Sequence, residues 1–225
     1  MYTTRSYCIK CFVKEGYNMR LLDNSISVVI VGDWNKLFIQ PDWIAINVFE
    51  SEEIEVGVEG KGSVVSISYQ KNNVIIKPSQ SKVVFSTLDI KEDTLSSLSK
   101  YVQNFIDQSF TPEISAYGFN IDFVDDEDTR IADVLDSMSD TTAICSMDFE
   151  IAATQVTRKL IKDGKEINMK CELSGTRTNI HFNEHFAKPK KDSISFSKDV
   201  FASFIKEAED IIVGLGYTVE DDEDE

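Results

Sequence analysis

The sequence has few of the features that mark membrane, secreted or metal-stapled proteins. Its 225 residues include only 4 cysteines, 4 prolines and 2 histidines. Apolar runs such as residues 27–31 are short, whereas a membrane-spanning helix needs about 20 apolar residues. Residues 1–14 hold no continuous hydrophobic segment after a basic start, which argues against a signal peptide. We therefore expect a cytoplasmic protein with reduced thiols and no membrane association.

Positive charge is also scarce. The chain has 39 Asp and Glu against 23 Lys and Arg, which gives a formal net charge of −16. Because a phosphate backbone is bound by a basic face, we expect no direct nucleic-acid binding. Residues 220–225 are all acidic and are typical of a solvated tail, but docking onto a partner with a basic surface stays open.

What the chain does contain is a globular composition with many strand-like segments. Hydrophobic residues make up 42% and aromatic residues 10%, enough to form a core at this length. Residues 63–69 alternate polar and apolar side chains, which is typical of an antiparallel sheet with one covered face. The predicted strands cover residues 7–13, 25–31, 36–39, 44–49, 54–58, 63–69, 73–76, 82–85, 118–124, 145–157, 167–173 and 178–182.

Two long amphipathic helices are predicted, at residues 91–107 and 198–214. Their apolar residues recur at three- and four-residue steps. Asp89 is a candidate cap for the first helix, and Gly214 or Gly216 is expected to end the second. A shorter helix is predicted at residues 129–138.

These patterns predict an α+β fold built on largely antiparallel sheet with two main helices. The chain divides into a β-rich half, 1–110, a second α+β half, 111–219, and the acidic tail, 220–225. Both halves run through strands and end in a helix, which indicates either a pseudo-repeat of two halves or one integrated domain with its helices on one sheet face.

An acidic cluster around residues 122–128 is the first candidate site. Asp122, Asp125 and Asp126 follow an apolar strand, and Asp148 lies in a later one. Carboxylates from neighbouring strands can hold Mg²⁺ or Mn²⁺ for phosphoryl-transfer chemistry. The same acids also suit the turn and cap before the helix predicted next in the chain.

Aromatic residues gather in a second candidate site. Trp34, Phe38 and Trp43 flank a turn that we predict to be a hairpin. Tryptophans in such a position are either core residues or exposed anchors of a protein interface.

Histidines and cysteines offer a weaker third candidate, a zinc site. His181 and His185 lie four residues apart in a predicted strand, with Cys171 upstream, and Cys8 and Cys11 have knuckle spacing. The apolar neighbours of these cysteines favour core packing instead.

The sequence contains no recognisable catalytic motif, so we expect a non-catalytic protein-binding module. A complex subunit, adaptor, inhibitor or chaperone-like protein would use the acidic surface and the tryptophan hairpin, without a cofactor. The alternative is a metal-dependent enzyme that acts on phosphate-containing substrates through the acidic cluster. Self-association stays open as well, because an edge strand as apolar as residues 27–31 needs a cover.

Overall fold

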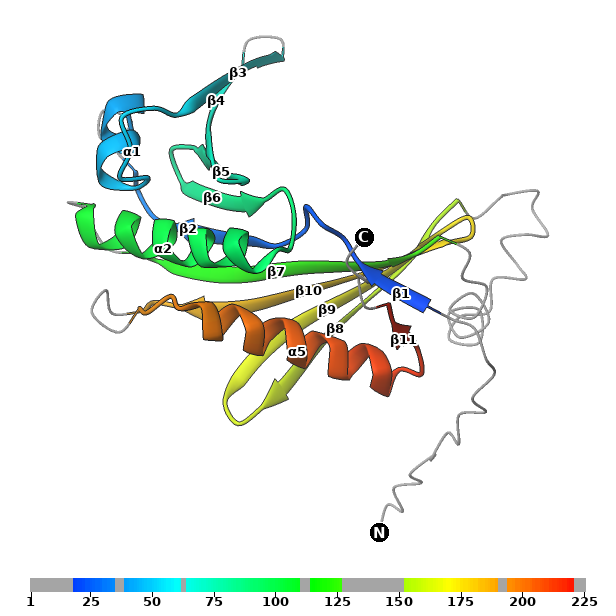
Figure 1. The fold of residues 1–225 in the computed structure, drawn as a ribbon. Helices are drawn as coiled ribbons and strands as arrows, with labels where there is room; N and C mark the ends of the chain where they lie inside the picture. Colours follow the sequence, from blue (N-terminus) through cyan, green and yellow to red (C-terminus); the bar gives the residue numbers. More distant parts are fainter. Residues whose placement is uncertain are drawn as a thin grey trace.

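A large antiparallel sheet with helices packed against it forms the body of the molecule (Figure 1). The computed structural model describes residues 18–34, 39–61, 64–109, 114–126, 152–189 and 194–220. The strands in these ranges are β1 Asn18–Leu21, β2 Ser27–Val31, β3 Glu55–Lys61, β4 Val64–Lys71, β5 Val74–Pro78, β6 Lys82–Thr87, β7 Ala116–Asp125, β8 Thr154–Lys162, β9 Lys165–Ser174, β10 Arg177–Ala187 and β11 Thr218–Val219. The helices are α1 Pro41–Asn47, α2 Glu92–Gln108 and α5 Lys198–Gly214.

Strand β7 is the centre of the sheet. Across the sheet, the strands follow the order β3-β4-β5-β6-β2-β7-β10-β9-β8. The whole length of β7 pairs with β10 on one edge. On the other edge, β2 pairs with the first half of β7 and β1 pairs with its end, around Phe123 and Val124. The predicted α+β fold with a large antiparallel sheet is confirmed.

The two halves of the chain follow the same path around this centre. In the first half, which begins with β1, strand β6 returns to pair with β2, and helix α2 follows. In the second half, β10 returns to pair with the opening strand β7, and α5 follows. Because β2 and β7 are themselves paired, both halves belong to one continuous sheet.

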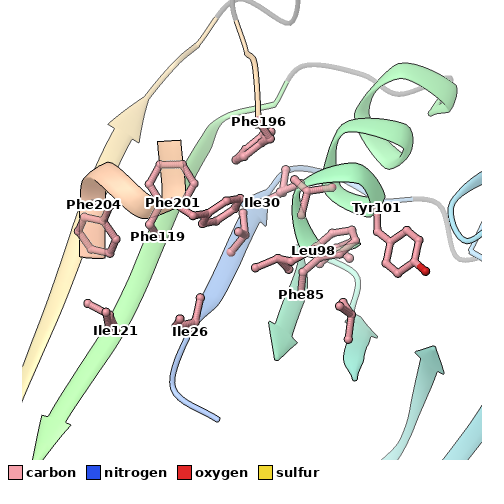
Figure 2. Packing of buried hydrophobic residues seen from close by; sticks show 14 of the residues in the cluster. Ile26, Ile30, Phe85, Leu98, Tyr101, Phe119, Ile121, Phe196, Phe201 and Phe204 are labelled. Atoms are coloured by element: carbon pink, nitrogen blue, oxygen red, sulfur yellow. The ribbon is translucent and has the colours of Figure 1, made fainter. Parts of the chain in front are cut away.

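Helices α2 and α5 lie side by side on one face of the sheet (Figure 1), where they enclose an aromatic core. Phe119 of β7 is 2% exposed, and its ring lies 5.2 Å from that of Phe201 and 5.8 Å from that of Phe204 on α5. Phe85 of β6 packs against Phe105 of α2 at 5.4 Å. Figure 2 shows Phe119, Phe201 and Phe204 close to one another, and Phe85 beside Leu98 of α2. None of the helices in the described ranges is long and apolar enough to cross a membrane.

Short terminal strands close the fold. Strand β1 pairs in parallel with β11, placing Asn18 opposite Thr218 and Met19 opposite Val219. Met19 is fully buried. Neither strand was predicted, because four and two residues carry too little alternation to stand out from the sequence around them.

Helix α1 replaces the strand that we predicted at residues 44–49. Pro41 occupies its first turn, where a missing N–H costs nothing. Ile44, Ala45 and Val48 are buried, whereas Ile46 is 66% exposed, which is the spacing of a helix and not of a strand. The β-branched residues of this segment suggested a strand, but its contacts follow the helical period. The tryptophan segment is therefore not the predicted hairpin.

Candidate protein-binding surface

Four exposed apolar side chains line one face of the hairpin formed by β3 and β4. We call this group the hairpin strip: Val56 (47% exposed), Val58 (67%), Val65 (67%) and Ile67 (40%). Large apolar groups at this exposure are common singly, but four on adjacent positions of one sheet face form a continuous patch. Such patches mark contact surfaces for other molecules.

The pairing register explains why the four side chains share a face. Val56 lies opposite Tyr69, and Val58 lies opposite Ile67. Because directly paired residues of antiparallel strands point to the same side, the strip continues the face to which buried Tyr69 belongs. The hairpin strip is thus a continuation of the core face, without the cover that the core receives.

The hairpin extends past the helices that cover the rest of this face. Figure 1 shows its tip pointing away from α1 and α2. Strand β3 pairs with β4, and among the described strands it has no neighbour on its other side. An edge of this kind presents backbone N–H and C=O groups to an additional strand.

A hollow of about 310 Å³ borders the strip. It is lined by Ile39, Val65, Ser66, Ile67, Tyr69, Pro78, Ser79 and Gln80. The Tyr69 hydroxyl donates a 2.8 Å hydrogen bond to the Ile39 carbonyl, and burial raises the pKa of this phenol. The Tyr69 side chain is therefore uncharged and held in place, and it separates the hollow from the core.

The opposite face and the approach to β3 are acidic. Glu55 and Glu59 alternate with the valines of β3 and are exposed. Glu52 and Glu53, just before the strand, are exposed as well. The nearby Lys71 ammonium is held by the Ser51 hydroxyl and by the Glu53 carbonyl oxygen, at 3.0 Å. The edge strand therefore combines an apolar face with an acidic one.

The tryptophans predicted as interface anchors lie elsewhere. Trp34 is 3% exposed and packs on Phe105 of α2, with ring centroids 5.0 Å apart, so it is a core residue. Trp43 of α1 is half-buried and meets the same Phe105 ring edge-on at 6.0 Å. Phe38 lies outside the described residues. An interface role for Trp43 stays a prediction.

The predicted acidic metal site is dispersed where the structure describes it. Asp122 accepts contacts from His181 Nδ1 at 3.0 Å and Asn179 at 3.3 Å. Asp125 lies three positions further along the strand and so points to the other face. Asp126 forms ion pairs with Arg20 and Arg177. Asp148 lies outside the described residues. Within the described ranges, no group of three or more His, Cys, Asp or Glu side chains could hold a metal ion.

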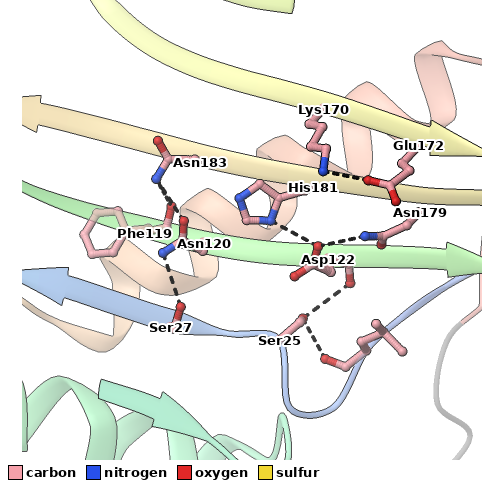
Figure 3. A network of polar contacts seen from close by, with 11 residues as sticks. Ser25, Ser27, Phe119, Asn120, Asp122, Lys170, Glu172, Asn179, His181 and Asn183 are labelled. Carbon is pink, nitrogen blue, oxygen red and sulfur yellow. Dashed lines mark hydrogen bonds and ion pairs between the residues drawn. The ribbon is translucent and has the colours of Figure 1, made fainter. Parts of the chain in front are cut away.

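Amide side chains cross the sheet on the face away from α2 and α5 (Figure 3). Asn183 Nδ2 donates to Asn120 Oδ1 at 2.9 Å, and Asn120 Nδ2 donates to the Ser27 hydroxyl at 3.2 Å. Asn168 continues the row by donating to Asn183 Oδ1 at 3.3 Å. These groups satisfy one another across four strands, so the row stabilises the pairing of the two halves.

The zinc candidate is also divided between two faces. His181 lies on the polar face, whereas Cys171 of β9 is buried on the core face and burial raises the pKa of its thiol. Cys8 and Cys11 lie outside the described residues. Cys171 therefore packs in the apolar core, on the opposite face of the sheet from His181.

The hairpin strip was missed at the sequence level although its signal is present. Residues 55–60 read Glu-Val-Gly-Val-Glu-Gly, in which two glycines and two glutamates leave only valines to pack. Strands 54–58 and 63–69 were predicted, but alternation alone does not say whether the apolar face is covered. No protein-family model matches the chain, and no curated protein matches it in sequence.

Proposed function

We propose that this protein is a non-catalytic protein-binding module, acting as a complex subunit, adaptor, inhibitor or chaperone-like factor. The hairpin strip is its contact surface, in place of the tryptophan segment. The observation that carries this proposal is the alignment of four exposed apolar side chains on one face of an edge hairpin. Burial of this strip by a partner would supply the apolar centre of an interface, and the surrounding carboxylates would form its polar rim.

The acidic charge supports the same function. A net charge of −16 favours rapid encounter with a partner that has a basic surface, and this attraction weakens as salt rises. Charge thus guides the encounter, while the hairpin strip supplies the short-range contacts that slow dissociation.

A capture experiment with a matched variant tests this proposal. The tagged protein is incubated with its native lysate at low and moderate salt, and bound proteins are quantified by mass spectrometry. We expect a stoichiometric partner that is lost from the double variant Val58→Thr/Val65→Thr. Threonine keeps the β propensity of both positions and removes their apolar surface, so the fold is retained.

The control carries the same chemical change at exposed sites far from the hairpin. Ile161→Thr/Val213→Thr alters side chains that are 68% and 57% exposed, on β8 and α5. This control should capture the partner normally. Equal loss in both variants, or equal capture by both, would contradict the hairpin strip as the contact surface.

A further inference from the structure

The edge strand β3 alternates two chemistries along its length. Val56 and Val58 face the apolar side, while Glu55, Gly57 and Glu59 face the other. A strand added beside β3 would have the same period of two, so its side chains would meet apolar groups on one face and carboxylates on the other. The edge therefore favours an added strand in which apolar side chains alternate with side chains that suit carboxylates.

We propose that β3 binds an extended segment of a partner protein in which apolar and basic residues alternate. This inference rests on the proposed function and names the class of partner. The segment adds to the sheet as its next strand, with main-chain hydrogen bonds to β3. Its apolar side chains extend the hairpin strip, and its Lys or Arg side chains lie beside Glu55 and Glu59.

Charge favours such a segment over a second copy of this chain. Each copy carries −16, and Glu52 and Glu53 add further carboxylates at the start of the edge. Pairing of two β3 strands around Gly57 would set Glu55 of one copy directly opposite Glu59 of the other. Like charges opposite one another destabilise a strand pair, whereas a basic segment removes that repulsion.

Local geometry makes the glutamate face accessible. A Cβ atom on Gly57 would lie 2.5 Å from the Ser68 hydroxyl, so the neighbouring strand fills this position and no bulky group stands between the two glutamates. The Ser66 hydroxyl donates a 3.4 Å hydrogen bond to the Glu59 carbonyl, in addition to the backbone pairing of β3 with β4. Glu55 and Glu59 are both exposed on this side of the edge, where their carboxylates can meet incoming cations.

Two synthetic peptides of identical composition test the pattern. One alternates lysine and valine, and the other groups all its lysines before its valines. Binding to the full chain is measured by fluorescence anisotropy of a labelled peptide at low salt. We expect the alternating peptide to bind about tenfold more tightly, because only it can place charges and apolar groups on opposite faces. Equal affinity of the two peptides would overturn the inference, since it indicates non-specific attraction to an acidic protein.

A charge-reversal variant locates the site. In Glu55→Lys/Glu59→Lys, the lysine peptide should lose about tenfold in affinity, and a peptide that alternates glutamate and valine should gain binding. Glu166→Lys/Glu172→Lys makes the same change on β9 and should leave both affinities unaltered. Loss in the β9 variant, or no loss in the β3 variant, would overturn the inference.

Two further outcomes separate this inference from the proposed function. If lysate capture depends on Val58 and Val65 while the peptides show no preference for the alternating pattern, the binding module stands and the partner class is wrong. The second outcome comes from light scattering, which measures the oligomeric state of the full chain. A dimer that is lost in Val58→Thr/Val65→Thr would assign the edge to a second copy and overturn the basic segment.

Discussion

Glu184 shows how one residue links helix α5 to the sheet. Its side chain is buried on β10, and its carboxylate forms an ion pair with Lys165 of β9 at 3.1 Å. Lys165 also contacts Glu207 of α5 at 2.5 Å. Burial raises the pKa of Glu184, and this outweighs the hydrogen bond from Lys165, which lowers it. Burial lowers the pKa of Lys165, but its hydrogen bonds to Glu207 and Glu184 raise this pKa by more, so that the net shift is upward.

The raised pKa predicts a pH-dependent effect of Glu184→Gln. The folded state holds the carboxyl proton more tightly than the unfolded chain, in which glutamate has a pKa of about 4.3. The contribution of Glu184 to stability is therefore full below that pH and is lost as pH rises through the raised folded value. Because Gln does not ionise, the melting temperature of the variant should rise relative to the wild type between acidic and neutral pH.

Glu166→Gln is the matched control for this measurement. A hydrogen bond from Lys159 lowers the pKa of exposed Glu166, so its contribution is present at neutral pH and is lost as pH falls through the lowered value. The melting temperature of this variant should therefore change in the opposite direction relative to the wild type. If the melting temperature of Glu184→Gln differs from that of the wild type by the same amount at every pH, burial does not raise the pKa of Glu184.

Single residues were the least predictable feature of the site. The sequence left Trp34 open as core or anchor, and only the position of Phe105, 71 positions further along the chain, decides for core. Asp122 and Asp126 were grouped because they are near in sequence, yet Asp122 contacts His181 in the middle of β10, whereas Asp126 pairs with Arg177 at the start of β10 and with Arg20 of β1. Partners that are remote in sequence leave no local pattern, so spacing alone could not resolve these roles.

At the scale of elements, the end of α5 depends on a glycine with a left-handed backbone. Gly216 has φ 90°, and its N–H donates to the Val213 carbonyl at 2.9 Å. The Tyr217 N–H donates to the Ile212 carbonyl at 3.3 Å, and both of these residues are buried. This arrangement is a Schellman motif, which satisfies the last carbonyls of the helix.

Two glycine substitutions at this helix end should have opposite effects. Gly216→Ala forces a Cβ atom into the left-handed region and should lower the free energy of unfolding by about 1 kcal/mol. Gly214 is the last helical residue, and a Cβ atom there would meet nothing within 4 Å. Gly214→Ala should therefore raise the free energy of unfolding by up to about 1 kcal/mol. Urea unfolding midpoints measure both, and effects of the same sign would argue against this account of the helix end.

Long helices and strands were predicted well, and short ones were not. Helices predicted at 91–107 and 198–214 correspond to α2 and α5, and the strands predicted at 63–69 and 167–173 correspond to β4 and β9. A hydrophobic period can be recognised only when it repeats several times, and these segments are long enough for that. Seven-residue α1 is too short for that, so its β-branched residues misled the prediction. The predicted helix at 129–138 lies outside the described residues.

For the molecule as a whole, the pairing of β2 with β7 joins the two halves. Both tryptophans of the chain lie in residues 1–110, so tryptophan fluorescence reports on the first half alone. Phe204 lies in the second half, is 3% exposed and packs on Phe119. Phe204→Ala should lower the free energy of unfolding by about 3–5 kcal/mol. We expect the fluorescence midpoint in urea to fall as far as the circular dichroism midpoint. A fluorescence midpoint that stays in place would show that the halves unfold independently.

The sequence indicated the order of elements at this scale but could not give the sheet order. Two halves that each end in a helix were visible as a pattern, and both a repeat and a single sheet were open. The join between β2 and β7 depends on pairs such as Val28 with Phe119, which lie about 90 positions apart. Register across such a distance is set by packing in the folded chain, and a single sequence carries no direct sign of it.

The parallel pair of β1 and β11 has a consequence for the order of synthesis. On the ribosome, β1 emerges long before β7, and its partner Thr218 follows Asn18 by 200 residues. The first half can form β2 to β6 and α2 before β7 and β11, the two strand partners of β1, have been synthesised. Once β7 has emerged, Arg20 and Leu21 of β1 can pair with Val124 and Phe123. The pairs of Asn18 with Thr218 and of Met19 with Val219 form only after translation delivers the residues beyond α5. The β1–β11 pair therefore joins the first described strand to the last and forms only after both have been synthesised.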